Sequence, residues 1–269
     1  MNYTLFLLQC QYSKFEYYRR YAMNIYDTLI IGSGYTSAGY AAACGGTVIC
    51  EEHQICDIGF YLPLRSFCYK HYSPKTEEGA ELLQIFNSLS LFREGEQNTN
   101  GFEFALCRYV SEKQFNILLK CRVIYTERRV DDIYDVTVQT NEGITHLLAK
   151  KVIDTTNRSG EKHYTVLFVC DDIGKVKDKL LSAYGGAQIE PAFYKGRYAL
   201  HISAQNTDEN RIKLEIYEKW RSLDVDARIL YMAPVFYGAA GDGRMSDGNY
   251  ENPIEAFEAG YFYGRECGK

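Results

Sequence analysis

The chain has 269 residues, a formal net charge of -5 and a sequence pI near 5.6. Hydrophobic residues make up 46% of it and charged residues 24%, which is typical of a folded globular protein and excludes extensive disorder. The acidic balance, without a stripe of Lys and Arg, argues against a nucleic-acid partner. A small-molecule substrate is therefore expected.

The nine cysteines are odd in number and never form a C-x-x-C pair. This pattern predicts reduced thiols in a cytoplasmic protein, with neither disulfides nor a metal site. Residues 1–22 contain one apolar patch, 5–8, which is too short to span a membrane, so no membrane anchor is predicted. We expect translation to begin at Met23 and residues 1–22 to be a leader that is not native.

The segment 26–39 predicts a strand, a tight glycine turn and a helix. Residues 27–31 form an apolar strand, and an alanine-rich helix follows at 37–44. Gly32 permits the sharp turn, and Gly34 lets the backbone approach a pyrophosphate whose charge rests on the helix N-terminus. Ser37 stands where the dinucleotide-binding fingerprint has its third glycine. The predicted cofactor ligands of this segment are Gly32, Ser33, Gly34, Thr36 and Ser37.

A second strand, 47–50, ends in Glu51 and Glu52. Glu51 follows Gly32 by 19 residues, close to the spacing of about 20 at which an acid binds the adenosine ribose. An acid in this place favours a free 2′-hydroxyl and disfavours a 2′-phosphate. These signals predict a dinucleotide but do not separate NAD from FAD.

Alternating apolar residues next predict strands at 122–125, 135–140 and 145–148, which make a three-stranded meander. A separate strand at 151–154 follows and ends in Thr155 and Thr156. Near the C-terminus, an apolar strand at 229–236 leads to Gly241 and Asp242, and Pro253 opens a helix at 252–263.

In this order, the motifs resemble those of FAD-dependent oxidoreductases of the glutathione-reductase-like flavoprotein superfamily, which has two dinucleotide-binding motifs. The resemblance implies an α/β protein with a Rossmann-like FAD-binding domain, a β-meander and a smaller substrate-binding α+β insertion. It also implies that Thr155, Thr156, Gly241, Asp242 and Pro253 contact FAD. In that superfamily the aspartate binds the ribityl or pyrophosphate region, and the last helix points at the N1/O2 edge of the flavin.

Two departures mark the chain as a compact and divergent member. Asn157 stands where the superfamily has a glycine after the strand, and no second glycine-rich turn follows a strand, so a separate NAD(P)H domain is not expected. We assign residues 23–55, 105–160 and 225–269 to the FAD-binding domain. Residues 56–104 and 161–224 are assigned to a substrate or cap region.

The cap region contains the candidates for contact with a substrate. It is predicted to hold a helix at 77–92, a strand at 196–204, and a helix capped by Asp208 whose apolar face is Ile212, Ile216, Trp220 and Leu223. The weak catalytic candidates are Arg65, His71, Arg197 and His201, and a solvated or structural role explains each equally well.

The sequence thus predicts an FAD-dependent oxidoreductase that transfers hydride between a small organic substrate and flavin N5. Oxygen, a quinone or an electron-carrier protein would be the second substrate. Two alternatives stay open, an NAD-dependent Rossmann enzyme and a non-catalytic module that binds flavin or nucleotide. The sequence determines neither the substrate nor the oligomeric state.

Overall fold

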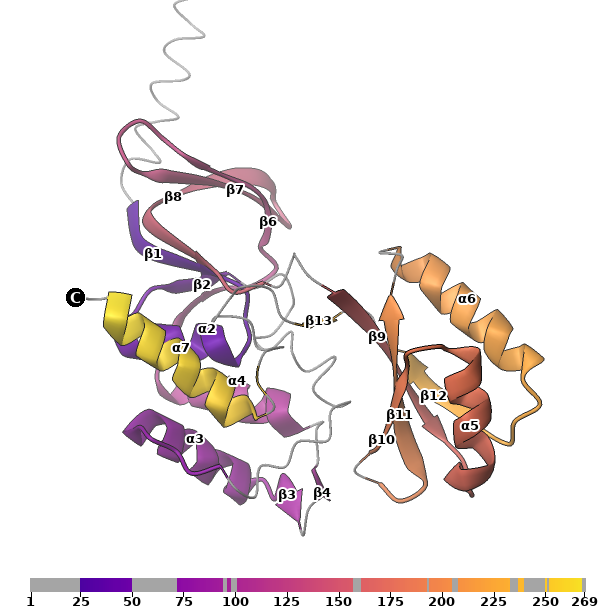
Figure 1. The fold of residues 1–269 in the computed structure, drawn as a ribbon. Helices are drawn as coiled ribbons and strands as arrows, with labels where there is room; N and C mark the ends of the chain where they lie inside the picture. The colour runs from indigo at the N-terminus through magenta and orange to yellow at the C-terminus, as the bar shows by residue number, and fades with distance from the viewer. Residues whose placement is uncertain are drawn as a thin grey trace, which may run out of the picture.

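The fold consists of two α/β bodies, each built on its own sheet (Figure 1). The computed structural model describes residues 25–49, 72–93, 96–97, 101–156, 161–192, 194–204, 208–232, 237–239, 250 and 252–267. The first body contains β1 (Ile25–Ile31), α2 (Tyr35–Cys44), β2 (Thr47–Ile49), α3 (Glu77–Ser88), β3 (Phe92–Arg93), β4 (Glu96–Gln97), α4 (Phe102–Glu112), β5 (Asn116–Leu118), β6 (Arg122–Arg128), β7 (Tyr134–Thr140), β8 (Gly143–Asp154) and α7 (Pro253–Cys267). The second body contains β9 (Glu161–Val169), α5 (Ile173–Ala183), β10 (Gln188–Pro191), β11 (Arg197–Ala204), α6 (Glu209–Ser222), β12 (Arg228–Met232) and β13 (Tyr237–Ala239).

The first sheet has six strands in the order β5-β2-β1-β8-β7-β6. Strands β5, β2, β1 and β8 run parallel, whereas β7 and β6 continue the sheet in antiparallel fashion. The unit β1-α2-β2 confirms the predicted strand, turn and helix. The second half of β1 is buried on both faces, which explains why its sequence is continuously apolar.

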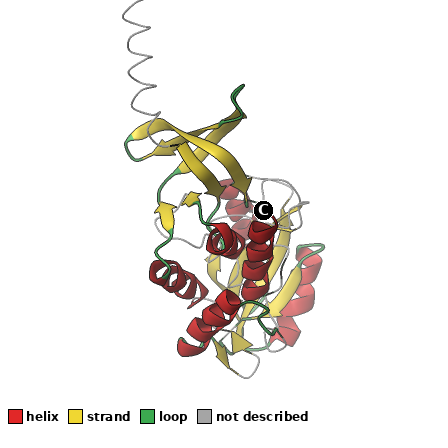
Figure 2. Ribbon diagram, turned by 90° about the vertical axis from the view of Figure 1, so that its left-hand side faces the viewer, coloured by secondary structure: helices red, strands yellow, loops and turns green. Residues whose placement is uncertain are grey.

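The meander differs from its prediction in one respect. The expected strands at 145–148 and 151–154 are a single 12-residue strand, β8, which pairs with β7 on one side and with β1 on the other. No turn residue separates the two predicted strands, so the chain continues straight from the meander into the parallel part of the sheet. The strands β6, β7 and β8 rise away from the helical layer (Figure 2).

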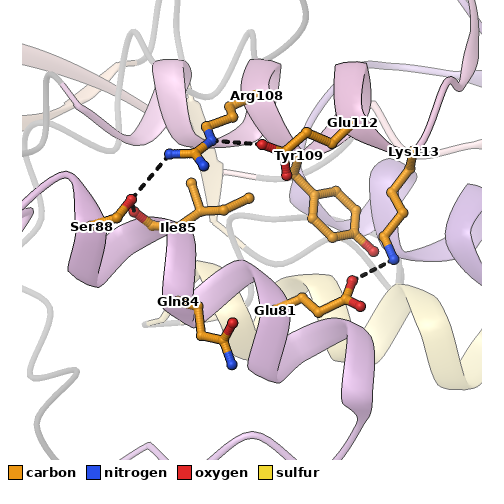
Figure 3. A pocket seen from close by; sticks show the side chains of 8 residues that line it. All are labelled: Glu81, Gln84, Ile85, Ser88, Arg108, Tyr109, Glu112 and Lys113. Carbon is orange, nitrogen blue, oxygen red and sulfur yellow. Dashed lines mark hydrogen bonds and ion pairs between the residues drawn. The ribbon is translucent and has the colours of Figure 1, made fainter.

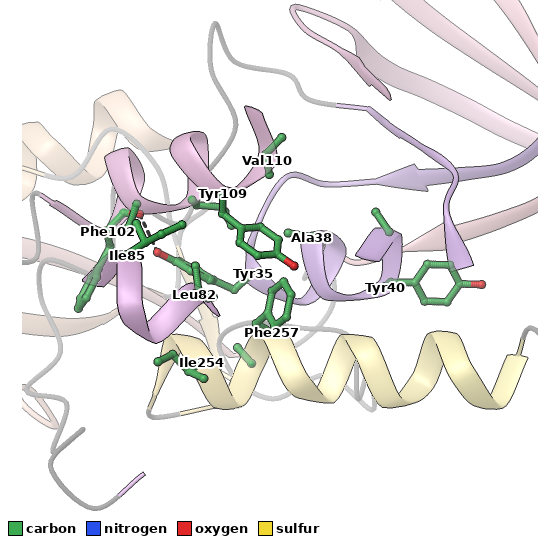
Figure 4. Close-up of a cluster of buried hydrophobic side chains, with 14 of the residues drawn as sticks. Tyr35, Ala38, Tyr40, Leu82, Ile85, Phe102, Tyr109, Val110, Ile254 and Phe257 are labelled. Atoms are coloured by element: carbon green, nitrogen blue, oxygen red, sulfur yellow. Dashed lines mark hydrogen bonds between the residues drawn. The ribbon is translucent and has the colours of Figure 1, made fainter. Parts of the chain in front are cut away.

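Four helices, α2, α3, α4 and α7, build one large core on a single face of this sheet (Figure 4). Tyr35 of α2 is fully buried there, and its hydroxyl donates to the Phe102 carbonyl at 2.6 Å. A smaller cluster on the opposite face joins Leu29 and Ile31 to Val136 and Val138 of the meander. Helix α2 is therefore enclosed by the protein before any ligand is considered.

Helix α3 is shorter than predicted, and two elements near it were not predicted. The helix stops at Ser88 because Ser90 takes a left-handed backbone with φ 51°, and β3 begins at Phe92. Helix α4 and strand β5 fill a stretch where the sequence analysis placed no element. The assignment of residues 56–104 to a substrate region stays a prediction, and α3 itself packs into the core of the first body.

The second body is an antiparallel sheet covered by helices α5 and α6 on one face (Figure 1). The predicted strand at 196–204 is confirmed as β11, and the Asp208-capped helix is confirmed as α6. Asp208 Oδ1 accepts from the backbone N–H groups of Asn210 and Arg211 at 3.0 and 3.2 Å. Trp220 is 7% exposed and lies in the core of this body.

The strand expected at 229–236 proves to be different. Strand β12 ends at Met232 and pairs antiparallel with β9, so it belongs to the second sheet and not to the FAD-binding sheet. Residues 233–236 lie outside the described ranges. Within those ranges, no helix is both long enough and apolar enough to cross a bilayer.

Candidate cofactor site

The glycine turn after β1 is held tightly against the end of β8. Gly32 has a φ of 102°, and a Cβ atom built on it would lie 2.3 Å from Thr155 Oγ1. The backbone N–H and the hydroxyl of Thr155 both donate to the Ile31 carbonyl at 2.8 Å. Both the conformation and the space at position 32 therefore require glycine.

Predicted residues of the turn and of the following helix lie in a buried place. Ser33, Thr36 and Ser37 are at most 1% exposed. The Ser37 hydroxyl donates to the Gly34 carbonyl at 2.7 Å, so the residue at the third glycine position is small and internally paired. Gly34 is the N-cap of α2 and has a φ of -86°, a conformation that does not itself call for glycine.

Helix α7 lies directly against α2, backbone to backbone. A Cβ atom built on Gly39 would lie 1.8 Å from the Phe257 carbonyl oxygen, and one on Gly260 would lie 1.9 Å from the Thr36 carbonyl oxygen. Gly264 faces Tyr40 and Ala43 in the same way, so contacts advance along both helices in the same direction. The two helices are therefore parallel and begin side by side, as Figure 4 also shows.

The start of α7 is capped by Asn252. Its Oδ1 accepts from the Ile254 N–H at 2.8 Å, and its backbone carbonyl accepts from the Ala256 N–H at 2.9 Å. Pro253 occupies the first helical position, where a missing N–H costs nothing. Two parallel helix N-termini thus place two positive dipole ends next to each other, an arrangement that suits an anionic or electron-rich ligand.

Two buried polar atoms at these helix starts support a ligand. Ser33 Oγ and Asn252 Nδ2 are buried and have no hydrogen-bond partner within the described part of the chain. Unpaired buried polar groups are rare in native proteins, because each costs about 1–3 kcal/mol. The residues therefore fit a bound group with hydrogen-bonding atoms at both helix starts, as a dinucleotide has.

A buried carboxylate fixes α7 to α3. Glu258 is 1% exposed, and its Oε1 accepts from the backbone N–H groups of Lys75 and Thr76 at 2.6 and 2.7 Å and from the Thr76 hydroxyl at 2.8 Å. Its Oε2 accepts from the Tyr72 hydroxyl. Burial, followed by the hydrogen bond to Glu258, raises the pKa of Tyr72, so this hydroxyl keeps its proton. The sequence analysis missed Glu258, although an acidic residue one turn into an apolar helix face was a visible signal.

Several predicted site residues cannot be placed. The ribose candidates Glu51 and Glu52 and the motif residues Gly241 and Asp242 lie outside the described residues, as do the substrate candidates Arg65 and His71. The structure does bring together the turn at Gly32, Thr155 at the end of β8, and the helix that Pro253 opens. Thr156 caps the same strand end by donating from its N–H to Asp154 Oδ1 at 2.8 Å.

The two remaining candidates belong to the second sheet. His201 is 5% exposed on β11, with Nδ1 3.2 Å from Thr165 Oγ1 and Nε2 3.7 Å from Glu190 Oε2. Arg197 is exposed and lies over the Tyr194 ring at 4.7 Å. His201 is thus a buried histidine held between two polar neighbours, whereas Arg197 has a surface contact. Neither touches the residues of the glycine turn in any recorded contact.

The hollows lined by described residues lie away from the glycine turn. A cavity of about 460 Å³ separates α3 from α4 and contains the ion pairs Lys113–Glu81 and Arg108–Glu112, the second at 2.8 Å (Figure 3). A neighbouring hollow of about 390 Å³ reaches Gly45, at the opposite end of α2 from Gly34. Within the described ranges, no group of three His, Cys, Asp or Glu side chains could hold a metal ion.

Comparison with known proteins identifies the fold. No known family and no curated protein matched the sequence. Among solved structures, BexE, reported in a study of oxidation during BE-7585A biosynthesis, matches with a TM-score of 0.52 at 12% identity, over 80% of this chain and 52% of that one. The likeness confirms the predicted α/β fold class, with a sheet of the Rossmann type.

Two further matches have lower scores. A geranylgeranyl bacteriochlorophyll reductase-like protein from Thermoplasma acidophilum has a TM-score of 0.49 at 14% identity, over 90% of this chain and 77% of that one. Aklavinone-11 hydroxylase, solved with FAD and aklavinone, has a TM-score of 0.47 at 12% identity, over 81% and 54%. The chain spans 66%, 52% and 53% of the first three structures that it matches.

Proposed function

We propose that this chain is an FAD-dependent oxidoreductase. The observation that carries the proposal is the pair of parallel helix starts, each with a buried polar atom that awaits a partner, Ser33 Oγ and Asn252 Nδ2. A Rossmann turn alone would hold any dinucleotide. The second helix start, contributed by α7 from the far end of the sequence, suits a cofactor that extends beyond its pyrophosphate, as FAD does.

The chain's residues would share the cofactor as follows. The N-terminus of α2 and the Ser33 hydroxyl would bind the pyrophosphate, and Glu51 or Glu52 would bind the adenosine ribose. Thr155 and Thr156 would border the turn, while Asp242 and the helix opened by Pro253 would hold the flavin end. When bound, FAD supplies the acceptor for hydride or single electrons. Membership of the glutathione-reductase-like superfamily is part of the same proposal.

The substrate side is proposed to be a small organic molecule that gives hydride to flavin N5, with oxygen, a quinone or a carrier protein as second substrate. The structural matches support a flavin enzyme in outline, because those with descriptive names include hydroxylases and a reductase-like protein. The second sheet would supply the substrate wall. His201 and Arg197 are its candidate residues.

The first experiment is the absorption spectrum and mass of whatever co-purifies with the protein. FAD would give an absorbance band near ~450 nm and a stoichiometric yield. In Gly34→Val, a side chain would occupy the approach of the pyrophosphate, so FAD should be lost, whereas the control Gly185→Ala, with nothing within 4 Å of the added methyl, should retain it. Stoichiometric FAD in Gly34→Val would refute the site. Bound NAD would identify the alternative enzyme, and flavin that no substrate reduces would identify a binding module.

A further inference from the structure

Asn252 has a side chain with two separate functions. Its Oδ1 caps α7 by accepting from the Ile254 N–H at 2.8 Å, so the carbonyl half of the amide is engaged within the protein. The Nδ2 half is buried and has no partner within the residues described. The whole residue is only 5% exposed, so water does not readily satisfy this donor.

The position of Asn252 places this donor beyond the pyrophosphate. Gly39 of α2 lies against Phe257 and Tyr261, and Gly260 lies against Thr36. In parallel helices with this register, the first turn of α7 extends past the beginning of α2 at Tyr35 by about one turn, or roughly 5 Å. A ligand whose pyrophosphate rests on α2 therefore presents a later part of its length to Asn252.

Resting on the proposed function, we propose that Asn252 Nδ2 donates a hydrogen bond to a carbonyl oxygen of the flavin ring and thereby helps to set the flavin's reduction potential. The ring carbonyls are acceptors without N–H partners of their own, and they become more electron-rich on reduction. A donor with a fixed cap on its other atom is preorganised for that acceptor, because Oδ1 prevents the amide from turning.

Two substitutions separate this function from capping. Asn252→Asp keeps an oxygen for the Ile254 N–H but replaces the donor with a negative oxygen, and Asn252→Ser keeps a capping oxygen and removes the donor without adding charge. Asn210→Asp, on the exposed start of α6, is the control for added charge. After removal of FAD, both Asn252 variants should melt at or near the wild-type temperature, since Asp and Ser cap helices as well as Asn does.

With FAD, Asn252→Asp should bind the cofactor at least tenfold more weakly and lower its two-electron reduction potential, because a carboxylate disfavours the negative reduced flavin. A tenfold preference against the reduced form corresponds to about 30 mV. Asn252→Ser should weaken binding and shift the potential less. The measurements are FAD titration by fluorescence quenching and potentiometry with a reference dye.

The possible outcomes separate the two proposals. If the wild type takes up no FAD in titration, the proposed function fails and the role of Asn252 fails with it. If the wild type binds FAD but both Asn252 variants have wild-type affinity and potential, only the inference about Asn252 is overturned. An unchanged potential with weaker binding would likewise overturn the contact with the ring. A loss of stability in the FAD-free variants equal to the loss with FAD would reduce Asn252 to a helix cap.

Discussion

Replacement of Gly260 by alanine tests the contact between α2 and α7. The new methyl would lie 1.9 Å from the Thr36 carbonyl oxygen, whereas ordinary contact begins at 3.4 Å, so the helices must separate by the difference of 1.5 Å. Overpacking of this kind costs about 1–3 kcal/mol, and the obstacle here is backbone that cannot rotate away, which favours the upper end. The better helix propensity of alanine returns about 1 kcal/mol. We expect a net loss of about 2 kcal/mol.

Thermal unfolding measures this loss, at roughly 2–4 °C for each kcal/mol in a chain of this size. Gly264→Ala should have an intermediate effect, because the added methyl would lie 2.8 Å from the Ala43 Cβ atom, and Gly185→Ala should have none. Gly260→Ala should also retain less FAD, since Thr36 belongs to the first turn of α2. Equal melting temperatures for Gly260→Ala and Gly185→Ala would refute the backbone contact.

Three further predictions concern buried polar groups. Ser33→Ala removes a hydroxyl that has no partner, so the FAD-free protein should be as stable as the wild type or up to about 1 kcal/mol more stable, while FAD titration should show weaker binding; a destabilised FAD-free variant would contradict this. Glu258→Gln places an amide among four donors and should cost about 3 kcal/mol by thermal unfolding, against less than 0.5 kcal/mol in roughly surface-level terms for the exposed Glu112→Gln; similar losses for the two would remove the proposed lock. Burial raises the pKa of Tyr184 to about 12, so the neutral form is favoured by folding, and stability that is complete below the ordinary value of 10.0 should fall as the pH rises from there toward 12; melting curves between those values should decline less steeply for Tyr184→Phe, and parallel curves would contradict the burial effect.

The first βαβ unit could be predicted because local signals agreed. The apolar run of β1, the left-handed glycine at position 32 and the small residues of α2 each indicate the same unit. Helix α6 was equally predictable from its Asp208 cap and its periodic apolar face. Both elements depend on residues that are close together in the sequence.

Other parts of the fold depend on distant partners. The division of β8 into two predicted strands was wrong because its pairing partners change along its length, from β7 to β1, and a sequence pattern does not reveal partners. Strand β12 was assigned to the wrong sheet for the same reason. Helix α4 was predictable in principle, since Phe102, Ala105, Leu106, Tyr109 and Val110 have helical spacing and are all buried.

At the candidate site, the turn was predictable but its completion was not. The contact of Gly39 and Gly260 joins segments more than 200 residues apart, and a glycine within a helix does not by itself reveal what approaches it. The split function of the Asn252 side chain likewise depends on burial. Sequence showed a good capping residue and nothing of the unused donor.

The pairing of α2 with α7 has a consequence for biosynthesis. The first half of the proposed cofactor cradle leaves the ribosome early, whereas Pro253 and the glycines of α7 are made more than 200 residues later. Until then, α2 has one side without the helix that covers it, and long-range contacts of this kind form late in folding. Capture of the flavin would thus be confined to chains translated through α7, so that cofactor retention reports on completion of that helix.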